Sequence, residues 1–75
     1  MARLPRITGK QALAALKRMG FAVVRIHGSH HHLYHWSRKV VVTVPVHSGE
    51  TLAPKTLKSI LTQAGVSLDS FIQQL

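Results

Sequence analysis

Apolar residues near the start of the chain recur at the spacing of one face of a helix. They are Ala12, Leu13, Leu16 and Met19. Thr8 and Gln11 have the spacing of a capping box, in which each side chain binds the backbone N–H of the other residue. Gly20 follows the last apolar position and suits the left-handed residue that ends many helices. The pattern predicts an amphipathic helix over residues 9–19.

A second stretch with helical spacing lies near the end of the chain. Its apolar positions are Leu57, Ile60, Leu61 and Ala64. Pro54 suits the first helical position, where the N–H that proline lacks would have no partner anyway, and Gly65 ends the pattern. Ser67 then fits the N-cap of a last short helix.

Short stretches rich in β-branched and aromatic residues lie between the two helices. They predict strands over residues 21–27, 30–36 and 40–44. Gly28 and Ser29 separate the first two stretches and predict the tight turn of a hairpin, with a positive φ at Gly28. The stretches therefore predict an antiparallel sheet.

Alternation along each strand predicts which side chains face the core. The inward set of the first strand is Ala22, Val24 and Ile26. We prefer this set because the alternate positions include the charged Arg25. In the second strand we expect Leu33 to point inward, although alternation alone also allows the face that carries Trp36. For Trp36 we expect packing against the domain rather than stacking on a nucleic-acid base.

The predicted order is helix, strand, strand, strand, helix, with a short helical tail. We expect residues 1–75 to form a single α+β domain. Both helices would cover one face of the antiparallel sheet, and the opposite face would stay open. This α-β-β-β-α order is also the order of the double-stranded-RNA-binding domain.

Charge indicates the kind of partner. The chain carries 10 Lys and Arg residues against 2 acids, for a formal net charge of +8. A small and strongly basic domain typically binds a polyanion, and nucleic acid is the usual one. No stretch has the apolar length of a membrane span, and no signal peptide precedes the first helix. We therefore expect a soluble, cytoplasmic protein.

The composition also disfavours several kinds of chemistry. Cysteine is absent, which excludes a Cys nucleophile, a disulfide and a thiolate zinc site. Glu50 and Asp69 are distant from the histidine-rich stretch, which disfavours paired-carboxylate catalysis and a carboxylate-bound magnesium pair. His30 and His32, about 6.6 Å apart along a strand, could share a zinc ion, but the remaining ligands are not evident. We expect no metal and no other cofactor.

Most of the histidines surround the predicted hairpin turn. His30 would begin the second strand, where a side chain is held rigidly and reaches solvent. Imidazole titrates at about pH 6.5, so such a histidine can take or give a proton in RNA cleavage, in which the 2′-OH of the RNA is the nucleophile. The alternative is a turn histidine that only binds backbone. We expect most of the other histidines at the surface or at the edge of the core, and hydrogen bonds across the strand ends for His35 and His47.

Basic residues are the candidate contacts for an RNA backbone. Lys55 and Lys58 lie in the first turns of the second helix, where helix N–H groups and lysines can bind one phosphate together. The alternative is that exposed lysines are tolerated at most positions. The predicted RNA-binding set is Ser29, Arg25, Arg38, Lys39, Lys55 and Lys58.

Several short motifs occur in the order and spacing of one known family. They are Gly9-Lys10, Gly20-Phe21, Gly28-Ser29-His30-His31, Val44-Pro45-Val46-His47, Thr56-Leu57-Lys58-Ser59-Ile60-Leu61 and Ala64-Gly65-Val66-Ser67. With these motifs the chain closely resembles the HicA-type (YcfA-like) toxins of HicA–HicB toxin–antitoxin systems over nearly its whole length. Lys55 departs from the pattern, since many members have glycine there.

The resemblance implies a specific function. It implies a double-stranded-RNA-binding-like fold and an endoribonuclease, an mRNA interferase, that cleaves mRNA without the ribosome. It further implies that His30, directly after Gly-Ser, is the catalytic residue, and that a HicB antitoxin covers the active site. The alternative from a different class is a non-catalytic double-stranded-RNA-binding module in which the histidines are structural.

Overall fold

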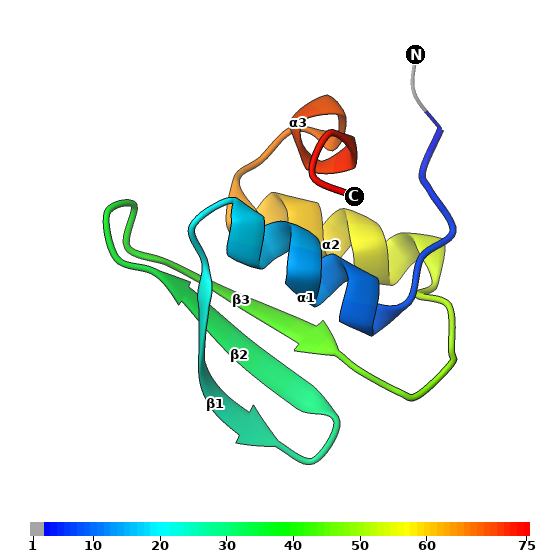
Figure 1. Ribbon diagram of the computed structural model, residues 1–75, viewed down its shortest axis with the longest axis horizontal. Helices are drawn as coiled ribbons and strands as arrows, with labels where there is room; N and C mark the ends of the chain where they lie inside the picture. Colours follow the sequence, from blue (N-terminus) through cyan, green and yellow to red (C-terminus); the bar gives the residue numbers. More distant parts are fainter. Residues whose placement is uncertain (1–2) are drawn as a thin grey trace.

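A computed structural model describes residues 3–75, so the first two residues of the expected domain lie outside the described part. Its elements in chain order are α1 (Gly9–Arg18), β1 (Ala22–His27), β2 (His30–His35), β3 (Val40–Pro45), α2 (Pro54–Ala64) and α3 (Leu68–Ile72). The strands form one antiparallel sheet in the order β1-β2-β3 (Figure 1). The expected α+β fold, with α-β-β-β-α order and a helical tail, is confirmed.

The helix ends follow the local signals in the sequence. Both hydrogen bonds of the capping box between Thr8 and Gln11 are present at the start of α1. Pro54 is in the first turn of α2, and Gly65 ends that helix in the left-handed region with a φ of 66°. The Ser67 side chain caps α3 by accepting from the Ser70 N–H.

The core lies between one sheet face and the helices. Leu33 of β2 pairs with Val42 of β3, and both are fully buried, as is Val44 on the same face. They form one cluster with buried residues of α1, α2 and α3, and both α1 and α2 pack on β3. The helices therefore cover the face that carries Leu33, which confirms its inward orientation. We call the opposite face, which carries His30, His32 and Tyr34, the open face.

The expected inward set of β1 is wrong. Val24 and Ile26 are 52% and 60% exposed, and Val23 packs against the core instead. A register shift between Val23 and Arg25 makes Val24 a bulge residue, which interrupts the alternation of faces. Ile26 returns to the inner face, but β1 is the edge strand and lies beyond the part of the sheet on which the helices pack.

The expected packing of Trp36 is also wrong. This side chain follows the end of β2 and is 61% exposed. Its ring contacts Tyr34 edge-on, with ring centroids 5.0 Å apart and an interplanar angle of 81°. Trp36 is thus held beside the open face, because Tyr34 points to that side.

A close approach of two backbones joins α1 to the end of β3. Gly9, the first residue of α1, is buried, and a Cβ there would collide with the Pro45 carbonyl oxygen and lie 3.0 Å from the Val46 Cα. No side-chain rotation can relieve a collision between backbones. The glycine is therefore required by packing.

Gly9→Ala is expected to lower the free energy of unfolding by about 1–3 kcal/mol, because the added methyl must push two backbones apart. The better helix propensity of alanine, about 1 kcal/mol, offsets part of this cost. Thermal and urea unfolding measure the change. Lys10→Ala, at the neighbouring exposed position, is the control and should change stability by less than about 0.5 kcal/mol. An unchanged melting temperature for Gly9→Ala would contradict the packing argument.

Candidate active site

One end of the domain brings together four segments that are distant in the sequence. The β1–β2 turn, the end of β3 and the N-termini of α1 and α2 all lie on the same side (Figure 1). The Val46 N–H donates to the Ser29 carbonyl at 2.7 Å, which ties the turn to the end of β3. The Leu52 N–H donates to the Ile7 carbonyl at 2.7 Å, which ties the loop before α2 to the segment before α1. We call this region the histidine end.

His30 is the first residue of β2 and lies at the histidine end. Its strand partners are His27 on one side and Pro45 on the other, so its backbone is held by both neighbouring strands. The side chain is exposed. Within residues 3–75, its imidazole has no hydrogen-bond partner. A rigid backbone combined with a free imidazole is the arrangement that a general base needs before its substrate arrives.

The neighbouring histidines on β2 have local partners. Nδ1 of His31 lies 3.4 Å from the Ser29 carbonyl oxygen, and this histidine is half-buried. Nδ1 of His32 lies 3.1 Å from the Thr43 hydroxyl on the adjacent strand. Both imidazoles are therefore engaged within the sheet, in contrast to His30.

His35 is a structural residue at the other end of β2. Its Nδ1 accepts a hydrogen bond from the Arg38 N–H at 3.2 Å, and its ring packs edge-on against Phe21 with centroids 5.1 Å apart. Its ring also covers Gly20, where a Cβ would lie 2.8 Å from Nε2. The expected hydrogen bond of His35 at a strand end is confirmed.

A cavity of about 310 Å³ opens beside the end of β3. Its lining residues are Pro45, His47, Glu50, Thr51, Leu52, Ala53 and Thr56. The N-cap of α2 is Ala53, whose methyl side chain cannot accept from the first N–H groups, and the first turns of α1 and α2 contain no acid. Lys10 and Lys55 stand in these turns instead. The histidine end therefore combines two positive helix ends with basic side chains, which favours a bound anion.

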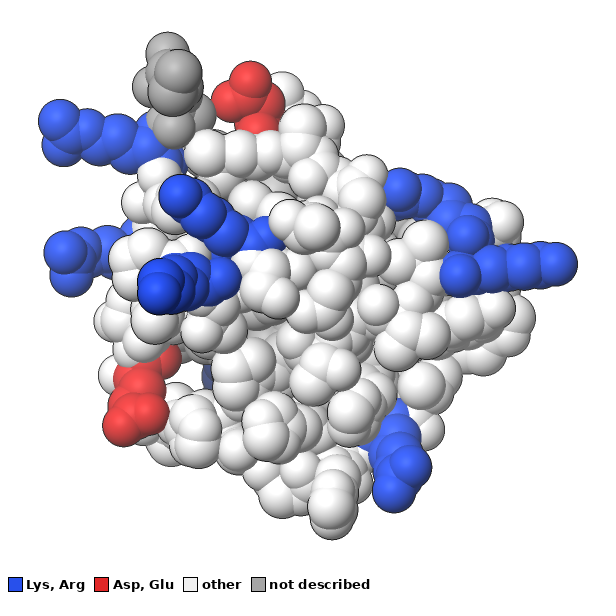
Figure 2. All heavy atoms as spheres, turned by 180° about the vertical axis from the view of Figure 1, so that it is seen from behind, with Lys and Arg blue, Asp and Glu red and all other residues white. Residues whose placement is uncertain are grey.

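The predicted basic residues do not form one cluster. Arg38 and Lys39 lie in the β2–β3 turn, and the Arg38 guanidinium donates to the Gly65 carbonyl at 2.9 Å, at the C-terminus of α2. Lys55 stands at the N-terminus of the same helix, about 15 Å away by the rise of α2. Figure 2 likewise shows Lys and Arg in separate groups toward the edges of one face, with uncharged atoms across its centre. Arg25 is separate again and pairs with His32 on the open face.

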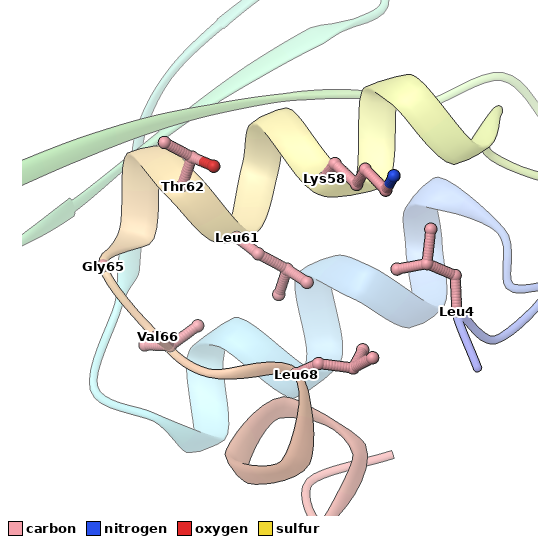
Figure 3. Close-up of a pocket in the computed structure, with 7 residues that line it drawn as sticks. All are labelled: Leu4, Lys58, Leu61, Thr62, Gly65, Val66 and Leu68. Atoms are coloured by element: carbon pink, nitrogen blue, oxygen red, sulfur yellow. The ribbon is translucent and has the colours of Figure 1, made fainter. Parts of the chain in front are cut away.

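Lys58 lies on a different surface from the histidine end. It lines a hollow of about 700 Å³, together with Leu4, Leu61, Thr62, Gly65, Val66 and Leu68. Figure 3 shows Leu61 pointing into this hollow from α2, while Leu4 reaches it from the N-terminal segment. The hollow is mostly apolar, so the surroundings of Lys58 differ from those of Lys55.

His27 is a further candidate that was not among the predicted site residues. It lies directly opposite His30 across the two-residue turn, and both residues are exposed. Directly paired residues on one face have Cβ atoms about 4.5–5.5 Å apart. The signal was present in the sequence, since a two-residue hairpin turn always pairs the residues on either side of it.

Two further observations concern metals and membranes. Within residues 3–75, no group of three or more histidine and acidic side chains comes together in the manner of a metal site. None of the helices in this described part combines the length and apolar character that crossing a membrane would require.

Comparison with known families identifies the class of protein. The sequence pattern of a family described as the HicA toxin of bacterial toxin–antitoxin systems matches residues 9–66, from the start of α1 to just past α2. The chain therefore belongs to the HicA toxin family. It is a toxin of a toxin–antitoxin system. Comparison with curated proteins gives no match.

Proposed function

We propose that this toxin is an mRNA endoribonuclease of a type II toxin–antitoxin system and that His30 is its general base. The observation that carries the proposal is the contrast among the histidines: His30 is exposed and free at the histidine end, whereas His31, His32 and His35 are engaged locally. An mRNA substrate would place its action in the cytoplasm.

The proposed reaction uses the nucleophile that RNA carries. The His30 imidazole accepts the proton of the 2′-OH, the 2′-oxygen bonds to phosphorus, and the bond from phosphorus to the 5′-oxygen breaks. His27, directly opposite His30, acts as the general acid and gives a proton to the departing 5′-oxygen. The products are a 2′,3′-cyclic phosphate and a 5′-hydroxyl. The N–H groups at the start of α2 and the Lys55 ammonium bind another phosphate of the same RNA.

This reaction needs no metal, because each proton moves between the RNA and an imidazole. Cleavage of an mRNA transcript by the purified protein in EDTA tests the proposal. The expected result is cleavage at the same rate as without EDTA, with fragments that end in a cyclic phosphate. RNA binding without cleavage would favour the alternative, a non-catalytic RNA-binding module.

Basic side chains supply most of the affinity for RNA in this proposal, with Ser29 as a polar contact. The basic set is Arg25, Arg38, Lys39, Lys55 and Lys58. Ser29 and Lys55 belong to the histidine end, and Arg25 lies on the open face beside His32. The engaged guanidinium of Arg38 keeps donors free for a phosphate, because arginine has five N–H groups.

Affinity for RNA is expected to fall steeply with salt. Each neutralised phosphate on a single strand contributes a slope of about −0.7 in a plot of log affinity against log salt concentration. Fluorescence polarisation with labelled RNA over a series of salt concentrations measures the slope. Lys55→Ala should reduce the magnitude of the slope by about 0.7, the value for one phosphate contact. Lys17→Ala, in the last turn of α1, should leave the slope unchanged. A flat salt response would contradict phosphate binding.

The proposed protein partner is a HicB-like antitoxin that covers His30. The toxin has a net charge of +8, so an acidic partner would be attracted to the same surfaces as RNA. Complementary charge chiefly raises the association rate, which suits an inhibitor that must compete with abundant RNA. Covering the histidine end would block both the general base and the helix ends that bind phosphate.

A further inference from the structure

The open face of the sheet carries an exposed aromatic patch. Trp36 is 61% exposed, Tyr34 contacts it edge-on, and Val41, the strand partner of Tyr34, is 56% exposed. A large aromatic side chain in a domain this small normally contributes to the core. An apolar patch that remains exposed commonly marks a binding surface.

The patch lies on the same face as His30. Because β2 pairs with β3 without a register shift, His30, His32 and Tyr34 project on one side of the sheet. His30 and Tyr34 are about 13 Å apart along the strand. Arg25 pairs with His32 and so stands between them on this face. A continuous line of side chains therefore runs from the aromatic patch past a cation to the candidate base.

Charge favours a polyanion as the occupant of this face. Arg25 lies on this face and Lys39 follows in the β2–β3 turn, whereas the Arg38 guanidinium binds Gly65 at the end of α2. The acids of the chain, Glu50 and Asp69, lie in the loop before α2 and in α3, so none lies on a strand. A strand of RNA offers both features that the face requires, a planar base for the indole and a phosphate for the cations.

We propose that the open face binds unpaired RNA, with one base stacked on Trp36 and the adjoining backbone along Arg25, so that the strand leads to His30. This inference rests on the proposed ribonuclease function and adds the class of substrate. A base within a duplex is already stacked on its neighbours and cannot reach the indole, whereas an unpaired base can stack on an exposed aromatic ring. The face therefore selects single-stranded segments over duplexes.

Trp36 is the only tryptophan, so its fluorescence reports directly on this site. His30→Ala protein in EDTA is titrated with a short oligoadenylate and, separately, with an RNA duplex of the same length. We expect oligoadenylate to quench the emission and the duplex to leave it nearly unchanged. Trp36→Ala in the same background should weaken oligoadenylate binding, measured by polarisation of labelled RNA, by roughly 5- to 150-fold. Trp36→Phe should retain most of the affinity.

Leu75→Ala is the matched control, because Leu75 is an exposed apolar residue at the end of the chain, 47% exposed and beyond α3. It should bind oligoadenylate like the parent. If Trp36→Ala also binds like the parent, the stacking site is overturned while the ribonuclease proposal stands. If Trp36→Ala loses binding to the antitoxin but not to RNA, the patch is a protein-docking surface and the inference is again overturned. If the parent binds no RNA and the wild type cleaves none, the proposed function itself fails.

Discussion

His30→Ala is expected to lower the rate of RNA cleavage by about 10²–10⁴-fold, the usual cost of removing a general base. RNA affinity should stay close to that of the wild type, because the phosphate contacts come from lysine and arginine side chains. Stability should change by less than about 1 kcal/mol, because the imidazole is exposed and has no partner within the described residues. Single-turnover cleavage, RNA affinity and melting temperature are the measurements.

Another histidine provides the matched control. His32→Ala should retain cleavage, because His32 is engaged with Thr43. His47→Ala is a comparison, because His47 lines the cavity beside the end of β3 but has no proton-transfer role in the proposed reaction. If His30→Ala cleaves like the wild type, the mechanism is wrong. If it unfolds, His30 is a structural residue and the alternative role as a turn histidine holds.

His27→Ala tests the assignment of the acid. It should lower the cleavage rate by about 10²–10⁴-fold, the usual cost of removing a general acid or base, and leave RNA affinity close to that of the wild type, because the phosphate contacts come from lysine and arginine side chains. A His27→Ala rate equal to that of the wild type would assign the acid to another group.

Phe71→Ala is expected to lower the free energy of unfolding by about 3–5 kcal/mol. Phe71 is fully buried in the main core, although it comes from α3, a helix of only 5 residues. A helix this short has little stability of its own, so it is held in place by what its side chains bury. Domains have a free energy of unfolding of about 5–15 kcal/mol, so this loss would be a large fraction of the total.

Urea unfolding followed by far-UV circular dichroism measures the loss. Leu75→Ala is again the control, because Leu75 is exposed, and its effect should stay within about 0.5 kcal/mol. An unchanged urea midpoint for Phe71→Ala would mean that α3 is not part of the cooperative unit. The prediction matters for the design of shortened proteins. The family match ends at residue 66, whereas Phe71, beyond that match, is part of the core.

Local signals in the sequence were enough to place the helices. The capping box at Thr8, Pro54 in the first turn of α2 and the left-handed Gly65 each act within a few residues. The inward direction of Leu33 was also predicted, although alternation alone allowed the opposite face, which carries Tyr34. These features depend on neighbours in sequence, so a single sequence can reveal them.

Features that depend on distant contacts were not predictable in the same way. The bulge at Val24 interrupts an alternation that otherwise looks regular, and nothing adjacent to it in the sequence marks it. The contact of Arg38 with Gly65 joins a turn to a helix end 27 residues later. The position of His30 in a strand followed from the Gly-Ser turn, whereas the link of this turn to the end of β3, and of that strand end to the start of α1, followed only from the folded backbone.

The edge position of β1 has a consequence for motion. Four of its six residues are exposed, and the helices pack on β3 rather than on this strand. Segments with few buried contacts open at lower free energy than the whole domain unfolds, so backbone amides of β1 should exchange with solvent faster than those of β2 and β3. His27 and Arg25 move with β1 in such an opening, while His30 stays on β2, held by its pairing with β3. The strand that opens more easily and the strands that stay paired thus each contribute one of the two histidines that face each other across the turn.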